Sequence, residues 1–122
     1  MNWKIDRSRP ISPQICEIIC VAVAKGEYAP DEKLLSVREI ALLAGVNPNT
    51  VQKSFEELER RGVIHSVRCS GWYVNENTSA AAEELASLRI KKTEEYLAEM
   101  AQLGCNPEEV IEYIKKCQGG TQ

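Results

Sequence analysis

The chain has 122 residues, of which 43% are hydrophobic and 27% charged, so it carries enough apolar material for a packed core. Fifteen Lys and Arg residues oppose 18 Asp and Glu residues, and the net charge of -3 excludes a polybasic, non-specific binder of nucleic acid. The longest apolar run is far shorter than the roughly 18 residues that a membrane span requires. Because the first ten residues contain no apolar segment, we expect neither a secretory signal nor a membrane partner.

The cysteine content indicates a reducing compartment. The five cysteines are odd in number and include no C-x-x-C pair, which is typical of a cytoplasmic protein and not of a disulfide framework. Cys16 and Cys20 stand four residues apart, so we expect both on one helix face as small core residues. With His65 as the single histidine, the sequence predicts no metal site and no cofactor.

The charge divides the chain into two parts. Residues 1–77 hold ten basic and ten acidic residues, whereas residues 78–122 hold five basic and eight acidic ones. The polar stretch 75–79 marks the same boundary. We therefore predict one domain over residues 1–76 and a helical region over residues 77–122.

A first helix is predicted to begin with Ser12 as N-cap and Pro13 as its first residue, and to end at Gly26. Its apolar residues follow the spacing of a single buried face: Ile15, Ile18, Ile19, Ala22 and Val23.

Two further helices follow with almost no linker between them. Ser36 and Glu39 have the spacing of a capping box, and Ile40, Leu43 and Ala44 form the predicted inner face behind it. After Gly45, Asn47 and Pro48 open another helix that runs to about residue 61, with Val51, Phe55 and Leu58 facing inward. A short capped helix, a glycine turn and a second capped helix form a helix-turn-helix arrangement.

The first turn of the second of these helices is polar and uncharged, which suits the reading of DNA bases. Asn and Gln side chains bond bidentately to adenine, Thr offers a hydroxyl or a methyl group, and a helix N-terminus attracts phosphate. The candidate base-reading residues are Asn47, Pro48, Asn49, Thr50, Gln52 and Lys53. The alternative is that Asn-Pro-Asn-Thr is a helix cap only.

A two-stranded hairpin is predicted directly after this helix. Residues 63–67 and 72–74 have strand character, with a turn over residues 68–71. Such a ribbon behind a recognition helix is a wing, and Arg68 and Gly71 at its tip are placed to reach phosphate or the minor groove. The alternative is an ordinary surface hairpin.

The ordered string over about residues 3–75 resembles the GntR superfamily of bacterial transcription regulators, and most closely its YtrA-type branch. The resemblance is carried by Pro10-Ile11, Gln14-Ile15, the run Leu34 to Ala41, the run Gly45 to Lys53, Glu57-Leu58-Glu59, Gly62-Val63-Ile64 and Gly71-Trp72-Tyr73-Val74.

The resemblance implies a mostly α (α+β) winged helix-turn-helix fold and roles for particular positions. Ser36 and Arg38 would contact the DNA backbone or a base near the groove edge. Asn47 to Thr50 and Gln52 would lie in the major groove, and Ser70 and Gly71 would touch the minor groove. The chain departs from the family pattern at Pro48, where Arg is frequent, and at Asp31 and Cys69, where glycine is usual.

The region beyond residue 78 predicts a two-helix dimerisation appendage. A long amphipathic helix spans about residues 79–103, and Asn106-Pro107 caps a last helix with an apolar side. A wide apolar face favours a two-fold homodimer, and packing on the chain's own winged domain is the alternative. The predicted interface residues are Leu85, Leu88, Tyr96, Leu97, Met100 and Leu103, on the same face as Ala82.

These observations favour a cytoplasmic, sequence-specific DNA-binding regulator that binds a palindromic operator as a homodimer, and they indicate no enzyme. The resemblance implies a repressor of its own operon and of an associated ABC-type transporter, with an effector that the sequence does not identify. Two alternatives stay open. One is a thiol-responsive switch through Cys69, which follows Arg68 at the wing tip. The other is a winged helix used only for protein–protein contact.

Overall fold

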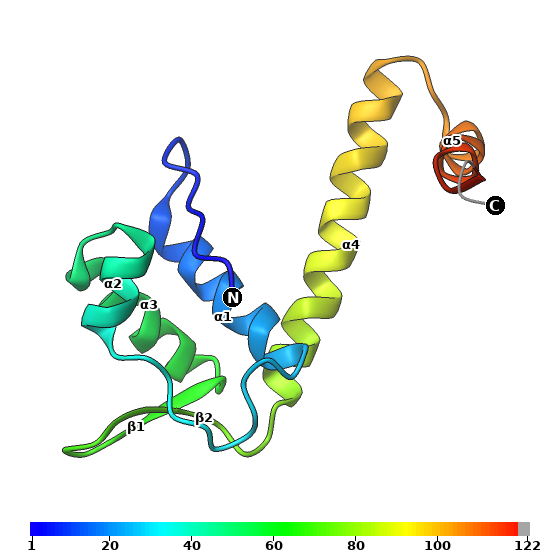
Figure 1. Ribbon diagram of the computed structural model, residues 1–122. Coiled ribbons are helices and arrows are strands. Elements are labelled where there is room, and N and C mark those ends of the chain that lie inside the picture. The colour runs from blue at the N-terminus through cyan, green and yellow to red at the C-terminus, as the bar shows by residue number, and fades with distance from the viewer. Residues whose placement is uncertain (120–122) are drawn as a thin grey trace. The chain divides into compact units, whose positions relative to one another are not determined.

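The computed structural model describes residues 1–119 and shows five helices and one two-stranded sheet in that range (Figure 1). The elements are α1 (Ile11–Ala24), α2 (Val37–Ala44), α3 (Pro48–Arg60), β1 (Ile64–Val67), β2 (Gly71–Val74), α4 (Ser79–Gln102) and α5 (Pro107–Gly119). They confirm the predicted winged helix-turn-helix fold with a helical C-terminal region. Two compact units result, Met1–Leu85 and a second that begins at Ala86.

The start of α1 differs from the prediction. The helix begins at Ile11 with Pro10 as N-cap, whose ring holds φ at -52° and whose side chain has no atom that could make a capping bond. The hydroxyl of Ser12 instead lies 2.9 Å from that of Ser54 on α3. Ser12 therefore joins two helices and caps neither.

The buried face of α1 is close to the predicted one. Ile15 and Ile19 are fully buried, and Cys16 and Cys20 are buried core residues as expected. Ile18 is only half-buried, so its predicted place in the core is wrong.

The two capped helices α2 and α3 form as predicted. Ser36 accepts a hydrogen bond from the Glu39 backbone N–H (3.1 Å), and the Glu39 side chain accepts one from the Ser36 N–H (3.0 Å). Gly45 ends α2 in the left-handed conformation, with φ at 67°. Leu43 is 59% exposed, so its predicted inward position is wrong. In this eight-residue helix the inner position is taken by the smaller Ala41.

The core of the first unit lies between α1, α3 and the hairpin. Phe55 is fully buried and its ring meets that of Trp72 edge to face, with 5.4 Å between the centroids. The antiparallel strands pair from Ile64 opposite Val74 to Val67 opposite Gly71. The aromatic pair anchors the hairpin on α3, which a hairpin of this size needs for stability.

The segment before α2 adds a short third strand-like stretch that the sequence did not predict. The N–H of Leu34 donates to the Trp72 carbonyl (2.8 Å), and the N–H of Val74 donates to the Glu32 carbonyl (2.9 Å). These bonds hold the loop ahead of α2 against the wing.

The second unit consists of α4 from Ala86 onward and α5. Asn106 caps α5: its side chain accepts from the Glu109 N–H (2.9 Å) and its own N–H donates to the Glu109 carboxylate (3.1 Å). This reciprocal pair confirms the predicted cap. Val110 is buried beside it, whereas Ile111 and Ile114 are about half exposed. Within the described range, the apolar stretches of the helices are too short to cross a membrane.

Candidate nucleic-acid interface

The N-terminal turn of α2 carries Ser36 and Arg38. The Ser36 hydroxyl accepts the capping bond from Glu39, and hydrogen bonds from Ser36 lower the pKa of the Glu39 carboxyl. Arg38 is exposed two residues beyond the cap. The first turn of α2 thus presents free backbone N–H groups beside an exposed guanidinium, an arrangement that suits a phosphate group.

The N-terminal turn of α3 is fixed by Asn47, whose side-chain oxygen accepts from the Asn49 N–H (2.8 Å). Asn47, Pro48 and Asn49 are exposed, and Thr50 is half-buried. Asn47 therefore caps α3, as the sequence predicted. Capping leaves the Asn47 amide N–H₂ and the whole Asn49 side chain available to an external partner.

Gln52 and Lys53 follow on the next turn. Gln52 donates from Nε2 to a Glu56 carboxylate oxygen (3.2 Å), and Lys53 is exposed. A base that bonds to Gln52 must exchange with this intrahelical contact, so Glu56 competes with the base for the amide group.

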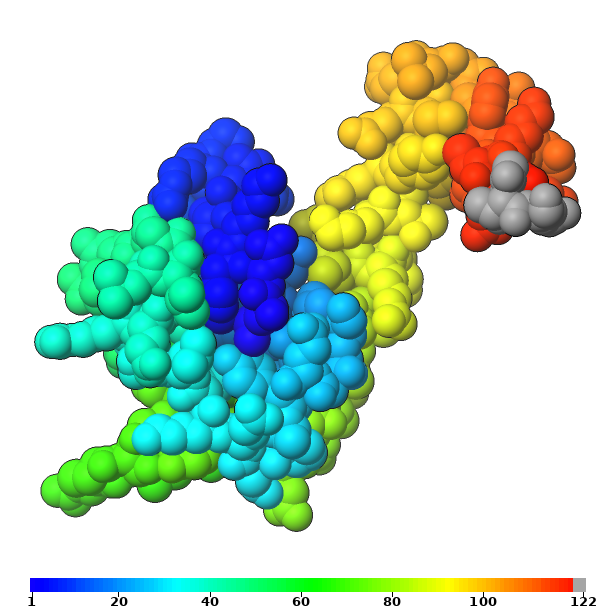
Figure 2. All heavy atoms as spheres, viewed as in Figure 1, coloured from blue at the N-terminus to red at the C-terminus, as the bar shows by residue number. Residues whose placement is uncertain are grey.

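The wing tip is a tight turn in which the Ser70 N–H donates to the Val67 carbonyl (3.0 Å). Arg68 and Ser70 are exposed, and the Ser70 hydroxyl bonds to that of Tyr73. Figure 2 shows the green hairpin tip standing clear of the helices of its own unit. The predicted tip residues are therefore free to enter a groove.

Lys33 lies next to the wing and adds a positive charge to the candidate DNA interface, a position that was not predicted from the sequence. Its Cε would lie 3.1 Å from a Cβ built on Gly71, and residue 33 pairs with Tyr73. The sequence of residues 31–34 has no strand pattern, so the pairing of residue 33 with β2 could not be predicted from it. Lys33 places an ammonium group close to the tip backbone.

Cys69 and Asp31 occupy glycine-like conformations, with φ at 64° and 65°. Both stand where the family pattern has glycine, so the backbone keeps the shape that glycine would allow. Asp tolerates this region better than Cys does, which leaves strain of about 1 kcal/mol at the wing tip.

The cysteines differ sharply in environment. Burial raises the pKa of the Cys16 and Cys20 thiols, and the bond from Cys20 Sγ to Glu84 (3.1 Å) adds to the effect at Cys20. These thiols are neutral and protected, whereas Cys69 is exposed.

The acidic residues of α3 are bound within the protein. Glu57 accepts hydrogen bonds from Arg60 (2.6 Å) and Arg61 (2.9 Å), which lower the pKa of its carboxyl. Glu59 accepts bonds from the backbone N–H (3.1 Å) and the hydroxyl of Ser66 on β1. Glu57 is thus paired within α3 and its C-cap, and Glu59 ties the end of α3 to β1.

His65 has a structural place in the hairpin. Its Nδ1 lies 2.6 Å from the side-chain oxygen of Asn75, whose amide donates to the Gly62 carbonyl (2.7 Å). Within residues 1–119, no three side chains of His, Cys, Asp or Glu are grouped so that they could hold a metal ion.

The predicted dimer residues form a partly covered apolar face. Leu85, Leu88, Leu97 and Met100 are half-buried, whereas Tyr96 is 42% and Leu103 is 79% exposed. At the start of the same helix, Ala81 is fully buried and Ala82, on the predicted face, is exposed. Ala81 packs into the core of the first unit.

The geometry defines a class of protein, namely a DNA-binding regulator with a winged helix-turn-helix domain. Residues 12–74 match the family described as bacterial regulatory proteins, gntR family. The chain belongs to this GntR family. Because the matched family and the relatives below are transcriptional regulators, the chain is a DNA-binding transcription regulator and not an enzyme.

Two relatives come from Bacillus subtilis (strain 168). The HTH-type transcriptional regulator YhcF is 35% identical over 115 residues, which cover 94% of this chain and 95% of the relative. The HTH-type transcriptional repressor YtrA is 36% identical over 110 residues, which cover 89% and 85%. These matches extend beyond the winged domain into the helical region and confirm the resemblance to YtrA-type regulators.

Two solved structures extend the comparison. A GntR family transcriptional regulator from Listeria monocytogenes is 38% identical, with a TM-score of 0.80 over 92% of this chain and 98% of that one. The DNA-binding domain of AraR in complex with operator ORE1 is 29% identical, with a TM-score of 0.52 over 54% of this chain and 80% of that one. A domain of similar fold has thus been solved on operator DNA.

Proposed function

We propose that this chain is a dimeric, sequence-specific repressor that binds a palindromic operator upstream of its own gene. The observation that carries the proposal is the joint exposure of two capped helix N-termini and the hairpin tip in the first unit. The α2 end suits phosphate, the α3 end offers amide groups to base edges, and the tip suits the minor groove.

Each candidate contact has a defined place in this proposal. Ser36 and Arg38 hold the backbone, and Arg68, Ser70 and Gly71 meet the minor groove. The residues that contact the major groove are Asn47, Pro48, Asn49, Thr50, Gln52 and Lys53. Pro48 replaces a frequent arginine of the family, so its contact is apolar and suits the methyl group of thymine.

The helical region, residues 77–122 in the predicted division, supplies the homodimer interface. Support comes from the apolar side chains that this region leaves exposed, among them Ile90, Ile111 and Tyr113 beside the predicted set. A two-fold dimer places two winged domains on half-sites about one helical turn apart. The transport operon of the YtrA-type branch is the proposed target, and YtrA itself is described as a repressor.

Footprinting on the duplex upstream of the chain's own gene tests this function. We expect a protected palindrome at moderate salt and a dimer by light scattering. Substitution of Leu97 by Glu, with exposed Glu99→Gln as control, should yield monomers that lose operator affinity. The absence of any protected palindrome would contradict the proposal, and a wild-type monomer that binds equally well would contradict the dimer.

A second candidate, a thiol-responsive form of the same regulator, is favoured by one observation. Cys69 is exposed in a left-handed turn at the proposed minor-groove contact, so a bulky oxidised sulfur there would obstruct docking. Peroxide should weaken operator binding of the wild type and not of Cys69→Ser. An identical response of both proteins would remove this candidate.

A further inference from the structure

The N-terminal arm, residues 1–10, is firmly attached to α1 through the buried Gln14. The Gln14 side chain accepts a hydrogen bond from the Asp6 N–H (2.8 Å) and donates to the carbonyls of Asp6 (2.8 Å), Pro10 (2.9 Å) and Arg9 (3.3 Å). A buried amide with this many partners fixes the path of the segment that it bonds.

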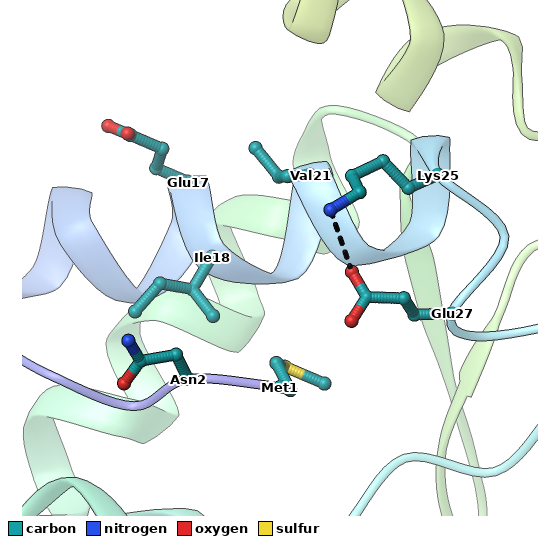
Figure 3. A pocket seen from close by; sticks show the side chains of 7 residues that line it. All are labelled: Met1, Asn2, Glu17, Ile18, Val21, Lys25 and Glu27. Carbon is teal, nitrogen blue, oxygen red and sulfur yellow. Dashed lines mark ion pairs between the residues drawn. The ribbon is translucent and has the colours of Figure 1, made fainter. Parts of the chain in front are cut away.

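Two other contacts stiffen the arm. The Asp6 carboxylate accepts bonds from the Ser8 N–H and hydroxyl, and these bonds together with a weak, exposed ion pair to Arg9 lower its pKa to about 2. Nearer the chain start, Trp3 and Ile5 are partly buried against the core, and Met1 and Asn2 border a hollow of about 410 Å³ beside Ile18 of α1 (Figure 3). The arm is therefore a structured element along α1.

Arg7 reaches from this arm to the helix-turn-helix turn. Its Nη2 donates to the carbonyls of Gly45 (2.8 Å) and Ala44 (3.1 Å), which lie 38 and 37 residues further along the chain. These carbonyls have no intrahelical partner, and a cation at the C-terminus of a helix is stabilised by the helix dipole. Figure 2 shows the blue arm in contact with the cyan-green region of α2 and its turn.

The turn to which Arg7 is hydrogen-bonded sets the angle between the first turns of α2 and α3, the two proposed DNA contacts. Gly45 lies two residues before the cap Asn47, so any rotation at the turn moves the first turn of α3 relative to that of α2. A displacement of about 1 Å is enough to break a bidentate base contact.

We propose that Arg7 is a positioning residue for operator recognition: its bonds to Ala44 and Gly45 hold the turn so that the α2 and α3 ends match the operator together. This inference rests on the proposed function. Arg7 acts on the turn through its Nη2 bonds, and the salt dependence described below separates this role from a phosphate contact through its Nε and Nη1 groups.

The variant Arg7→Ala tests the proposal against the matched control Arg9→Ala. Both variants remove one arginine from the arm. Within residues 1–119, however, the Arg9 side chain bonds only to Asp6 and does not contact the turn. We expect Arg7→Ala to weaken operator binding by about tenfold, within the range of one base contact, and to leave affinity for a random duplex unchanged. Arg9→Ala should change operator affinity by less than about threefold.

Two readouts separate positioning from other roles. The slope of log affinity against log salt should stay unchanged in Arg7→Ala, since the loss of one phosphate contact per protomer reduces it by about 1 on a half-site and about 2 on the full palindrome. In the absence of DNA, amide exchange at Val46, which donates to the Ala41 carbonyl (3.0 Å), should accelerate in Arg7→Ala and not in Arg9→Ala.

A reduced salt slope in Arg7→Ala, equal operator affinities of the two variants, or unchanged exchange at Val46 would each overturn the inference. If the wild type binds no duplex from its upstream region, the proposed target is wrong and not the positioning role. The two variants are then compared on a duplex selected by the wild type from random sequence, where the same outcomes apply.

Discussion

Replacement of Gly45 by alanine tests the structural basis of the helix-turn-helix turn. Gly45 has φ at 67°, and a Cβ there would lie 2.9 Å from the Nη2 of Arg7. Gly26 has φ at 79°, and a Cβ there would meet no neighbouring atom within 4 Å, so Gly26→Ala carries the backbone strain alone. The pair separates strain from steric displacement of Arg7.

The magnitudes follow from these contacts. An alanine in the left-handed region costs about 1 kcal/mol, which is the expected loss in Gly26→Ala. In Gly45→Ala the guanidinium must also leave its two carbonyls, and an exposed charged hydrogen bond of this kind contributes about 1 kcal/mol. Gly45→Ala should therefore cost about 2 kcal/mol and melt roughly 4 °C below Gly26→Ala.

Urea unfolding followed by tryptophan fluorescence measures both variants, since Trp3 and Trp72 both lie in the first unit. In an Arg7→Ala background, the cost of Gly45→Ala should fall to that of Gly26→Ala, which gives a coupling energy of about 1 kcal/mol. Equal costs of the two glycine substitutions in the wild type, or a coupling near zero, would refute the proposed contact.

Three other predictions concern DNA contacts, strain and pH. Arg38→Ala and Gln52→Ala should each weaken operator binding by about 1–3 kcal/mol in anisotropy titrations, and normal affinity in both would place the recognition surface elsewhere. Cys69→Gly should relieve the left-handed strain and raise stability by up to about 1 kcal/mol in urea, whereas a loss would show that the turn is unstrained. The folded pKa of Asp6 is about 2, below its ordinary value of 3.8, so its contribution is present above about pH 4 and is lost as the pH falls through 2. The melting temperatures of wild type and Asp6→Asn should therefore converge between pH 4 and pH 2, and a constant difference would contradict this.

The parts of the fold that the sequence predicted well depend on local chemistry. Ser36 with Glu39 and Asn47 with Pro48 encode helix starts within four residues, and Gly45 encodes the turn between them. Such motifs fix the proposed interface almost completely, because the DNA-facing groups lie on the capped turns themselves.

The errors arose where tertiary contacts outweigh local pattern. Ser12 looks like a cap but bonds across to Ser54, and Leu43 fits an inner face that a short helix fills with a smaller residue. The contact from Arg7 to the turn spans 38 residues and follows from no local spacing. Lys33 lies beside the wing because residue 33 pairs with Tyr73, and the local sequence around Lys33 does not predict this pairing.

The distribution of ion pairs explains how a neutral winged domain can bind a polyanion. Arg9, Arg60 and Arg61 are each paired with a carboxylate. Among the described residues, the cations of the candidate surface make no ion pair within 4 Å: Lys33, Arg38, Lys53 and Arg68. If each meets one phosphate, the slope of log affinity against log salt is about -4 for one protomer and about -7 for a dimer. A measured slope near -7 on the full palindrome, falling to about -4 on a half-site, would show that these four cations meet phosphates although the chain as a whole is acidic. A slope near zero would show that they do not meet the backbone.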